Sequence, residues 1–255
     1  MAETTAGTEG PDWSAKAPVW IELWAHLSDP ARAAVADATG IGTGTRVLDV
    51  GCGSGEFCAL AAGRGAAASG IDAAEGMIEH ARLRLPDADL RVGPMEALPW
   101  ADESFDVVCG FNSFQFAADV AGALREAGRV TRPGGLVSIC NWASFRELFE
   151  LFDVLREELA PDDDASDPGR PRVGEPGVVE RLAAEAGLEP GAPREVDVPY
   201  EAPDQDTLVR AVMMEAAGAP EDAVRAIVDR AGERFRRPDG SYRFENRFRY
   251  VIARR

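Results

Sequence analysis

A short apolar segment followed by three alternating glycines constrains this chain more than any other feature. Residues 47–50 read Val-Leu-Asp-Val, and residues 51–55 read Gly-Cys-Gly-Ser-Gly. Apolar residues in a row are typical of a strand buried on both faces of a parallel sheet. The glycines let the backbone turn and approach a ligand closely, and a helix expected from Ser54 would direct its free N–H groups into the same space. The segment therefore predicts a strand–turn–helix unit that binds a small, partly anionic ligand.

Strand and helix patterns alternate from about residue 45 to residue 142. Strands are expected at 46–50, 68–71, 90–92, 105–110 and 136–140, with helices at 54–64, 74–85 and 120–130. This alternation predicts βαβ units with right-handed crossovers and a parallel sheet. Further strands near 194–198 and 242–253 would lie beyond it.

The rest of the chain divides by composition and periodicity. We expect a disordered tail at 1–12, an N-terminal helical lid at 13–44 and a cofactor-binding core at 45–142. A helical insertion with a linker and a further helix should follow at 143–192, and C-terminal strands and helices at 193–255 should complete the sheet. The lid assignment depends on the amphipathic pattern with Trp13, Trp20 and Trp24, and the linker on the Pro-, Asp- and Gly-rich run at 160–176.

Composition excludes several classes of function. The 44 acidic residues against 27 basic ones, a formal charge of −17, disfavour a nucleic-acid partner. No apolar run approaches the ~20 residues of a membrane span, so no membrane partner is expected. The four cysteines form no C-x-x-C pair and only two histidines are present, so no metal site is expected. The first residues lack the regions of a secretion signal, and we expect a cytoplasmic protein.

The spacing of the glycines discriminates between nucleotide cofactors. A dinucleotide fingerprint reads G-x-G-x-x-G, whereas here Glu56 occupies the position of the third glycine. A pyrophosphate beside Asp49 and Glu56 would be repelled. S-adenosyl-L-methionine fits better, because Asp49 favours its ammonium while backbone N–H groups bind its carboxylate. Asp72 ends the second strand, where an acid can accept hydrogen bonds from a ribose diol.

Five sequence blocks, in order, carry a family resemblance. They are residues 47–55, residues 70–72 with Met-Ile-Glu-His-Ala at 77–81, Glu-Ala-Leu-Pro-Trp at 96–100, Ser-Phe-Asp-Val-Val at 104–108, and Arg-Val-Thr-Arg-Pro-Gly-Gly at 129–135. Over about residues 45–141 the chain resembles the class I S-adenosylmethionine-dependent methyltransferases of the small-molecule, ubiquinone/menaquinone-biosynthesis-like group (methyltransferase type 11). The resemblance implies an α/β fold with a doubly wound, seven-stranded, mostly parallel Rossmann-like sheet, its last strand antiparallel, and N-terminal and inserted helices as a lid.

The resemblance also implies roles for individual residues. The methionine moiety of the cofactor would contact Gly51, Cys52 and Gly53, with Asp49 behind the ammonium and Asn112 nearby. The ribose would be held by Asp72, and the adenosine would pack on Ala73 and Met77. The adenine would contact Met95 and Glu96. The chain departs from the family at Pro94, where members often carry an aspartate for the adenine amine. Glu96, a backbone carbonyl or water would then make that contact.

Methyl transfer is an in-line displacement, which requires chiefly that nucleophile, methyl and sulfur be held collinear. A general base is needed only if the acceptor demands one, and the sequence identifies no catalytic residue. Candidates for the acceptor side are Trp20, His26, Gln115, Phe116, Asn141 and Trp142. The plain alternative is that these residues pack in the core or, for His26, lie on the surface. We hypothesise a lid, formed by the tryptophans and by Phe145, Phe149 and Phe152, that closes an apolar pocket.

The leading interpretation is a methyltransferase acting on a small organic acceptor, foremost at oxygen, with nitrogen or carbon also open. A second is an S-adenosylmethionine-binding enzyme of the same fold that catalyses a non-methylating cyclisation or elimination. A third, an NAD-dependent oxidoreductase, is disfavoured by Glu56 and the glycine spacing. The aromatic rows also leave a homodimer interface open.

Overall fold

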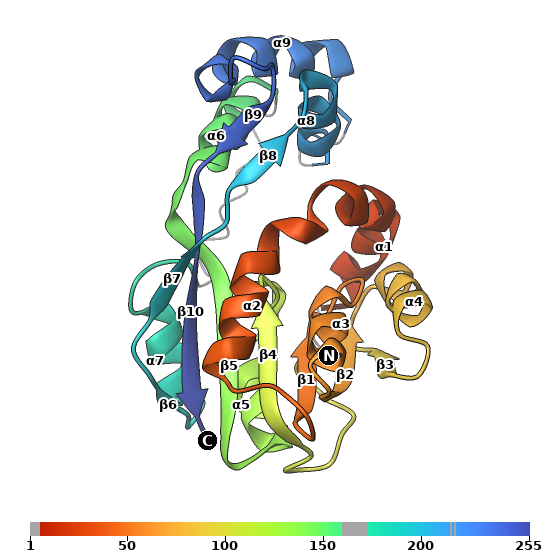
Figure 1. Cartoon of the computed structure of the whole chain (residues 1–255), viewed down its shortest axis with the longest axis vertical. Helices are drawn as coiled ribbons and strands as arrows, with labels where there is room; N and C mark the ends of the chain where they lie inside the picture. The colour runs from red at the N-terminus through yellow and green to blue at the C-terminus, as the bar shows by residue number, and fades with distance from the viewer. Residues whose placement is uncertain (1–5, 160–172, 215, 217) are drawn as a thin grey trace.

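A mixed sheet organises the molecule (Figure 1). The computed structural model describes residues 6–159, 173–214, 216 and 218–255, with side chains from residue 13 onward except at 144 and 145. The eight strands of the sheet are β1 (Arg46–Val50), β2 (Ala67–Asp72), β3 (Asp89–Val92), β4 (Phe105–Phe111), β5 (Thr131–Arg146), β6 (Glu189–Pro190), β7 (Arg194–Asp197) and β10 (Asn246–Arg254). Their order is β3-β2-β1-β4-β5-β10-β6, and β7 also pairs with β10.

The first five strands are parallel to one another, and β10 is antiparallel to β5. β6 pairs with residues 253–254 of β10 and β7 with residues 247–250, so these two short strands share one position at the edge of the sheet. Within the described residues the sheet therefore has seven positions with the last strand antiparallel. The predicted doubly wound α/β fold is confirmed.

Helices cover both faces of the sheet. The helices of the described residues are α1 (Ala6–Leu23), α2 (Asp29–Ala38), α3 (Glu56–Gly63), α4 (Glu75–Arg84), α5 (Val120–Val130), α6 (Glu147–Leu159), α7 (Val178–Glu185), α8 (Gln205–Val212) and α9 (Glu221–Ala231), with short 3-10 helices η1 (Ala25–Ser28), η2 (Phe114–Phe116) and η3 (Glu233–Phe235). Residues of α2 and α3 pack on one face in a core with Val47, Val107 and Cys140, and residues of α5 and α7 pack on the other with Leu48, Val108 and Ile139. Successive side chains of a strand point to opposite faces of the sheet, so each central strand contributes to both cores.

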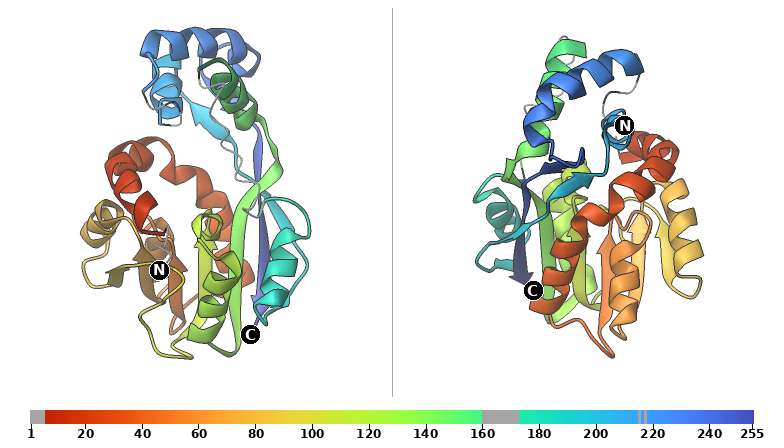
Figure 2. Two further views of the ribbon diagram at one scale, coloured as in Figure 1. Left: turned by 180° about the vertical axis from the view of Figure 1, so that it is seen from behind. Right: turned by 45° about the horizontal axis from the view of Figure 1, so that its top comes forward.

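A second body, which we call the cap, lies beyond the carboxyl ends of the strands (Figures 1 and 2). It consists of α6, α8, α9 and η3 with a two-stranded antiparallel sheet of β8 (Tyr200–Ala202) and β9 (Tyr242–Phe244). The long β5 runs up into it, and β10 returns from it. Trp24 joins the cap to the N-terminal helices, because its indole stacks on Tyr200 with centroids 4.8 Å apart and its Nε1 donates to the carbonyl of Ala211 (3.3 Å).

Two predicted boundaries need correction. Helix α1 begins at Ala6, so residues 6–12 are helical rather than a disordered tail, while residues 1–5 lie outside the described residues. In the C-terminal region 193–255 only β7 and β10 join the large sheet, whereas α8, α9, β8, β9 and η3 belong to the cap. Helix α7, in the range of the helix expected before residue 192, packs on the sheet face beside α5. Most of the predicted linker, 160–172, lies outside the described residues.

Two features that would change the choice of function are absent from the described ranges. None of the helices there is long and apolar enough to cross a bilayer. Nor does that part of the chain hold a group of three or more His, Cys, Asp or Glu side chains arranged to bind a metal ion.

Candidate cofactor and acceptor site

The glycine loop between β1 and α3 has the conformation that its glycines predict. Gly51, Gly53 and Gly55 have φ values of 71°, 53° and 83°, a region that side chains disfavour. A β-carbon on Gly51 would lie 2.3 Å from Cβ of Ser113, which follows β4. One on Gly55 would lie 3.1 Å from Cβ of Ala81 in α4. The glycines thus permit two close contacts as well as the turn.

The backbone amides of this loop are already committed within the protein. The amides of Gly51 and Cys52 both donate to the carbonyl of Ile71, at 2.8 and 3.0 Å. The amide of Gly53 donates to Oδ2 of Asp72 (2.8 Å), and that of Gly55 to the carbonyl of Cys52 (3.0 Å). Since each amide has one hydrogen to donate, these four amides are not available to a carboxylate. The predicted binding of a carboxylate by the free N–H groups at the start of α3 stays a prediction.

Asp72 lies half-buried at the carboxyl end of β2, directly beside the loop. Its Oδ2 accepts from Gly53 and its Oδ1 accepts from the amide of Ala74 (2.9 Å). Burial raises the pKa of Asp72, and the hydrogen bonds from Ala74 and Gly53 oppose that shift. Each carboxylate oxygen can accept a second hydrogen bond, so Asp72 fits the ribose role predicted for it.

Asp49 is the most unusual charged residue of the site. Its side chain is buried near the end of β1, with the residue 2% exposed, and its Oδ1 has no hydrogen-bond partner among the described residues. Burial raises the pKa of Asp49 to about 7; Arg32 opposes the shift, and Asp72 and Glu56 add to it. A buried carboxylate oxygen without a partner is costly unless a cation or donor reaches it. The residue therefore suits an ammonium ligand.

Glu56 does not repel anions as strongly as its charge alone predicts. Its carboxylate accepts from Arg84 Nη2 (2.9 Å) and from the hydroxyl of Ser54, and Oε2 lies 3.9 Å from Arg32 Nη2. Two arginines thus offset the charge of Glu56, which weakens the repulsion argument against a pyrophosphate. The unpaired carboxylate of Asp49 is the stronger reason to prefer a cationic ligand.

The residues predicted to bind adenosine lie on different elements. Met95 and Glu96 belong to the loop between β3 and β4, residues 93–104, where Met95 is half-buried and Oε1 of Glu96 accepts from the amide of Ala118 (2.8 Å). Ala73 is exposed, while Met77 is buried with Ala17 and Ala74 beneath α1. Met95 and Met77 pack in separate apolar clusters, and the contacts of all four residues with adenosine remain predictions.

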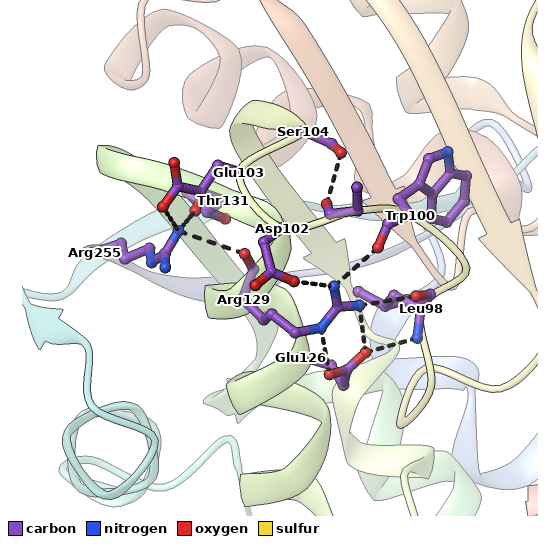
Figure 3. Close-up of polar contacts among 10 residues, drawn as sticks. Leu98, Trp100, Asp102, Glu103, Ser104, Glu126, Arg129, Thr131 and Arg255 are labelled. Carbon is purple, nitrogen blue, oxygen red and sulfur yellow. Dashed lines mark hydrogen bonds and ion pairs between the residues drawn. The ribbon is translucent and has the colours of Figure 1, made fainter.

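Arg129 of α5 holds this loop in place (Figure 3). Its guanidinium donates to the carbonyls of Leu98 and Trp100 (both 2.9 Å), to Asp102 (2.8 Å) and to both carboxylate oxygens of Glu126 (2.7 and 2.8 Å). Oε2 of Glu126 in turn accepts from the amide of Leu98 (2.9 Å). The sequence motif at 129–135 contained Arg129, but its role was missed because its partners lie about 30 residues earlier in the chain.

Asn112, predicted near the methionine end, has a structural task. It adopts a positive φ of 51°, its amide donates to the carbonyl of Cys140 (2.8 Å), and its Oδ1 accepts from the amide of Trp142 (3.1 Å). Asn112 thus joins the end of β4 to the middle of β5. The next residue, Ser113, is buried against Gly51, and its Oγ has no partner among the described residues.

The acceptor-side candidates separate into groups. Nδ2 of Asn141 donates to Oε1 of Gln115, and Asn141 is 2% exposed with its Oδ1 unpartnered among the described residues. Phe116 packs edge-on against Trp13 (5.8 Å between centroids), and Trp13 packs edge-on against Trp20 (5.4 Å). The structure thus brings Gln115 and Asn141 together, and it joins Phe116 to Trp20 through Trp13.

The two remaining candidates lie elsewhere. Trp142 packs edge-on against Phe149 of the cap and against Phe248, with centroids 5.1 and 4.8 Å apart. His26 is exposed in η1. Neither residue joins the Gln115–Asn141 pair.

The comparisons with known proteins agree with this site. The family model described as "Methyltransferase domain" matches residues 48–139, which span β1 to β5 and hold the glycine loop, Asp72 and the adenine-side loop. Residues 48–139 form a class I S-adenosylmethionine-dependent methyltransferase domain. Its cofactor is S-adenosylmethionine, which fits the unpartnered Oδ1 of Asp49, the three glycines of the loop and the acid at the end of β2.

Curated relatives match the methyltransferase domain over part of their length. A malonyl-[acyl-carrier protein] O-methyltransferase of Serratia marcescens is 36% identical over 114 residues, covering 45% of this chain and 44% of that protein. An uncharacterized protein of Mycobacterium tuberculosis is 38% identical over 109 residues, covering 41% and 40%. The chain thus spans about two fifths of the length of the relatives it matches.

Solved structures share the fold across the whole chain. The [4+2]-cyclase SpnF superimposes with a TM-score of 0.66 at 18% identity, covering 100% of this chain and 97% of that chain. A putative methyltransferase from Bacillus halodurans superimposes with a TM-score of 0.61 at 17% identity, covering 88% and 97%. At these identities the likeness concerns the fold alone.

Proposed function

We propose that this protein transfers a methyl group from S-adenosylmethionine to a small organic acceptor, and that the acceptor atom is oxygen. The observation that carries the proposal is the buried, unpartnered carboxylate of Asp49 beside the glycine loop of a methyltransferase domain. The choice of oxygen follows the O-methyltransferases among the relatives, which are 36% identical to this chain or more over the domain. We keep the cytoplasmic location expected from the sequence as part of the proposal.

In this proposal the residues of the chain hold the cofactor and do not react with it. When bound, S-adenosylmethionine supplies a methyl group on a positively charged sulfur, which needs no further activation. Asp49 neutralises the ammonium, Asp72 accepts from the ribose, and Gly51, Cys52 and Gly53 form a wall without large side chains near the methionine end. Ala73 and Met77 pack on the adenosine, and Met95 and Glu96 line the adenine side.

The acceptor is proposed to bind near Gln115 and Asn141, under a lid of α1 and the cap. Asn141 offers an unpartnered buried oxygen that can accept a hydrogen bond from an acceptor hydroxyl. Trp20 and Phe116 lie in one aromatic row through Trp13, and Trp142 packs on Phe149 of the cap. These rows supply apolar walls of the kind that bind small organic molecules. His26, exposed in η1, is proposed only as a residue at the rim.

Two measurements test the proposal in sequence. Calorimetry should detect binding of S-adenosylhomocysteine, and NAD should neither bind nor raise the melting temperature. A panel of small hydroxylated acceptors should then yield S-adenosylhomocysteine as product. Trp20→Ala and Phe149→Ala, with circular dichroism unchanged, should each lower turnover about 10-fold or more, and unchanged turnover in both variants contradicts the lid.

A second candidate is a non-methylating reaction on the same cofactor-binding fold. The cyclase SpnF among the structural neighbours motivates it, although the likeness covers the fold only. Product analysis separates the two candidates. A methyltransferase produces one S-adenosylhomocysteine for each acceptor consumed, whereas a cyclase or lyase consumes acceptor and leaves S-adenosylmethionine unchanged.

A further inference from the structure

The glycine loop leaves one half of the cofactor's amino-acid end without a partner. The methionine end of S-adenosylmethionine carries an ammonium, which Asp49 matches, and a carboxylate. The amides of Gly51, Cys52 and Gly53 already donate within the protein. These three amides are therefore not available to the carboxylate, and a buried carboxylate is best matched by a cation.

Arg32 of α2 is the buried cation nearest to this requirement. The residue is 7% exposed, its Nη1 donates to the carbonyl of Ala25 (2.6 Å) and to Oδ1 of Asp29 (2.9 Å), and its Nη2 lies 3.9 Å from Oε2 of Glu56. Its Nε is buried and has no hydrogen-bond partner among the described residues. A buried guanidinium N–H without an acceptor indicates that a ligand group belongs there.

Arg32 lies near the glycine loop and Asp49. Its ion partner Glu56 is the first residue of α3, directly after the glycine loop. Its charge acts on the carboxyl of Asp49, where it opposes the rise of the pKa, and on the thiol of Cys140 in β5. Nε of Arg32 and Oδ1 of Asp49 are both buried without a partner among the described residues, and they belong to the two opposite charges that a zwitterion requires.

We propose that Arg32 binds the carboxylate of S-adenosylmethionine through its Nε–H, opposite the ammonium held by Asp49. This inference rests on the cofactor assignment of the proposed function and deepens it. The guanidinium suits the role because Ala25 and Asp29 fix its orientation from the other side, so little side-chain freedom remains to be lost on binding. Two opposite charges of the protein would then fix the direction of the methionine chain.

The alternative is that Arg32 only supports the loop, through Glu56. Arg84 offers a matched control for that role, because its Nη2 contacts the same carboxylate (2.9 Å) and its Nε donates to the carbonyl of Ser54 (3.0 Å). The side chain of Arg84 is 41% exposed, against 8% for Arg32. An effect transmitted through Glu56 should therefore follow the loss of either arginine.

Calorimetry with two ligands tests the proposal. S-adenosylmethionine and decarboxylated S-adenosylmethionine both carry the ammonium and the sulfonium, and they differ only in the carboxylate. We expect Arg32→Gln to raise the Kd of S-adenosylmethionine about 10- to 100-fold, and to change the Kd of decarboxylated S-adenosylmethionine less than about 3-fold. Arg32→Lys, which keeps the charge but not the Nε–H, should lose less affinity for S-adenosylmethionine than Arg32→Gln does. Arg84→Gln should shift the Kd of both ligands by the same factor.

The outcomes separate the possible failures. Equal weakening of both ligands by Arg32→Gln overturns the carboxylate contact and leaves the proposed function standing. If the unaltered protein binds neither ligand, the cofactor assignment fails and this inference fails with it. Should Arg32→Gln not fold, Arg32→Lys decides by the same comparison, because a selective loss supports the contact and an equal loss contradicts it.

Discussion

Gly51 and Ser113 lie so close together that a β-carbon on Gly51 would be 2.3 Å from Cβ of Ser113. The first residue belongs to the loop after β1, and the second follows β4, the neighbouring strand. Their contact joins the cofactor loop to the segment that carries Gln115 and Phe116. The loop and the acceptor side of the site are therefore one packed unit.

Gly51→Ala should destabilise the protein and abolish cofactor binding. The positive φ of 71° costs a residue with a side chain roughly 1–2 kcal/mol, and relief of the clash with Ser113 adds about 1–3 kcal/mol. Urea denaturation should show a total loss of about 2–5 kcal/mol. The control is Gly44→Ala, because Gly44 has a φ of 82° and no atom lies within 4 Å of the added carbon. This variant should lose only the roughly 1–2 kcal/mol of unfolding free energy that the positive φ costs. Equal losses would contradict the role of the contact.

Asp49→Asn should remove a dependence of stability on pH. The pKa of Asp49 is raised to about 7, from about 3.9 in the unfolded chain. Between these values the folded protein binds more protons than the unfolded one, so its stability falls as the pH rises from about 4 to about 7 and is constant above. The difference in unfolding free energy between Asp49→Asn and the unaltered protein should follow this window, by about 4 kcal/mol at most. A difference in unfolding free energy that does not change between pH 4 and pH 7 would contradict the raised pKa of Asp49.

The same carboxyl should make cofactor affinity depend on pH. Only the ionised form attracts the ammonium, so the affinity for S-adenosylmethionine should fall by up to about tenfold for each pH unit below 7. Calorimetry from pH 5 to pH 8 measures this. Asp49→Asn should bind weakly, with little change over that range.

Arg129→Gln should loosen the adenine side of the site. The carbonyls of Leu98 and Trp100 and the carboxylate of Glu126 lose their charged donor, which should cost about 2 kcal/mol of unfolding free energy. Binding of S-adenosylhomocysteine should weaken as well, because the loop carries Met95 and Glu96. Arg125→Gln, on the same helix with an exposed ion pair to Asp119, is the control and should change stability by less than about 1 kcal/mol.

Asn141→Ala should affect the acceptor and not the cofactor. We expect kcat/KM for the acceptor to fall about 10-fold, because a buried hydrogen-bonding oxygen is lost, while the Kd of S-adenosylhomocysteine stays the same. Ser138→Ala is a control on the same strand, since it also removes a buried unpartnered oxygen, three residues farther from the strand end. A similar loss in both variants would indicate a general effect of β5.

The sequence by itself determined the strand–turn–helix unit, the parallel strands up to β5 and the position of Asp72. These features depend on local patterns, namely apolar runs, alternating glycines and an acid at a strand end. The cap could not be predicted, because its strands β8 and β9 are 40 residues apart at their closest register, Ala202 with Tyr242, and each is too short to show a pattern.

Only the tertiary structure decided which polar atoms of the site already have partners. It showed the loop amides donating to Ile71 and Asp72, Glu56 offset by arginines from α2 and α4, and Arg32 buried with a free Nε. The residues involved are separated in the chain, and a hydrogen bond between distant segments exists only after the strands and helices have packed. The sequence thus identified the cofactor loop, whereas the packing decided how its charges are matched.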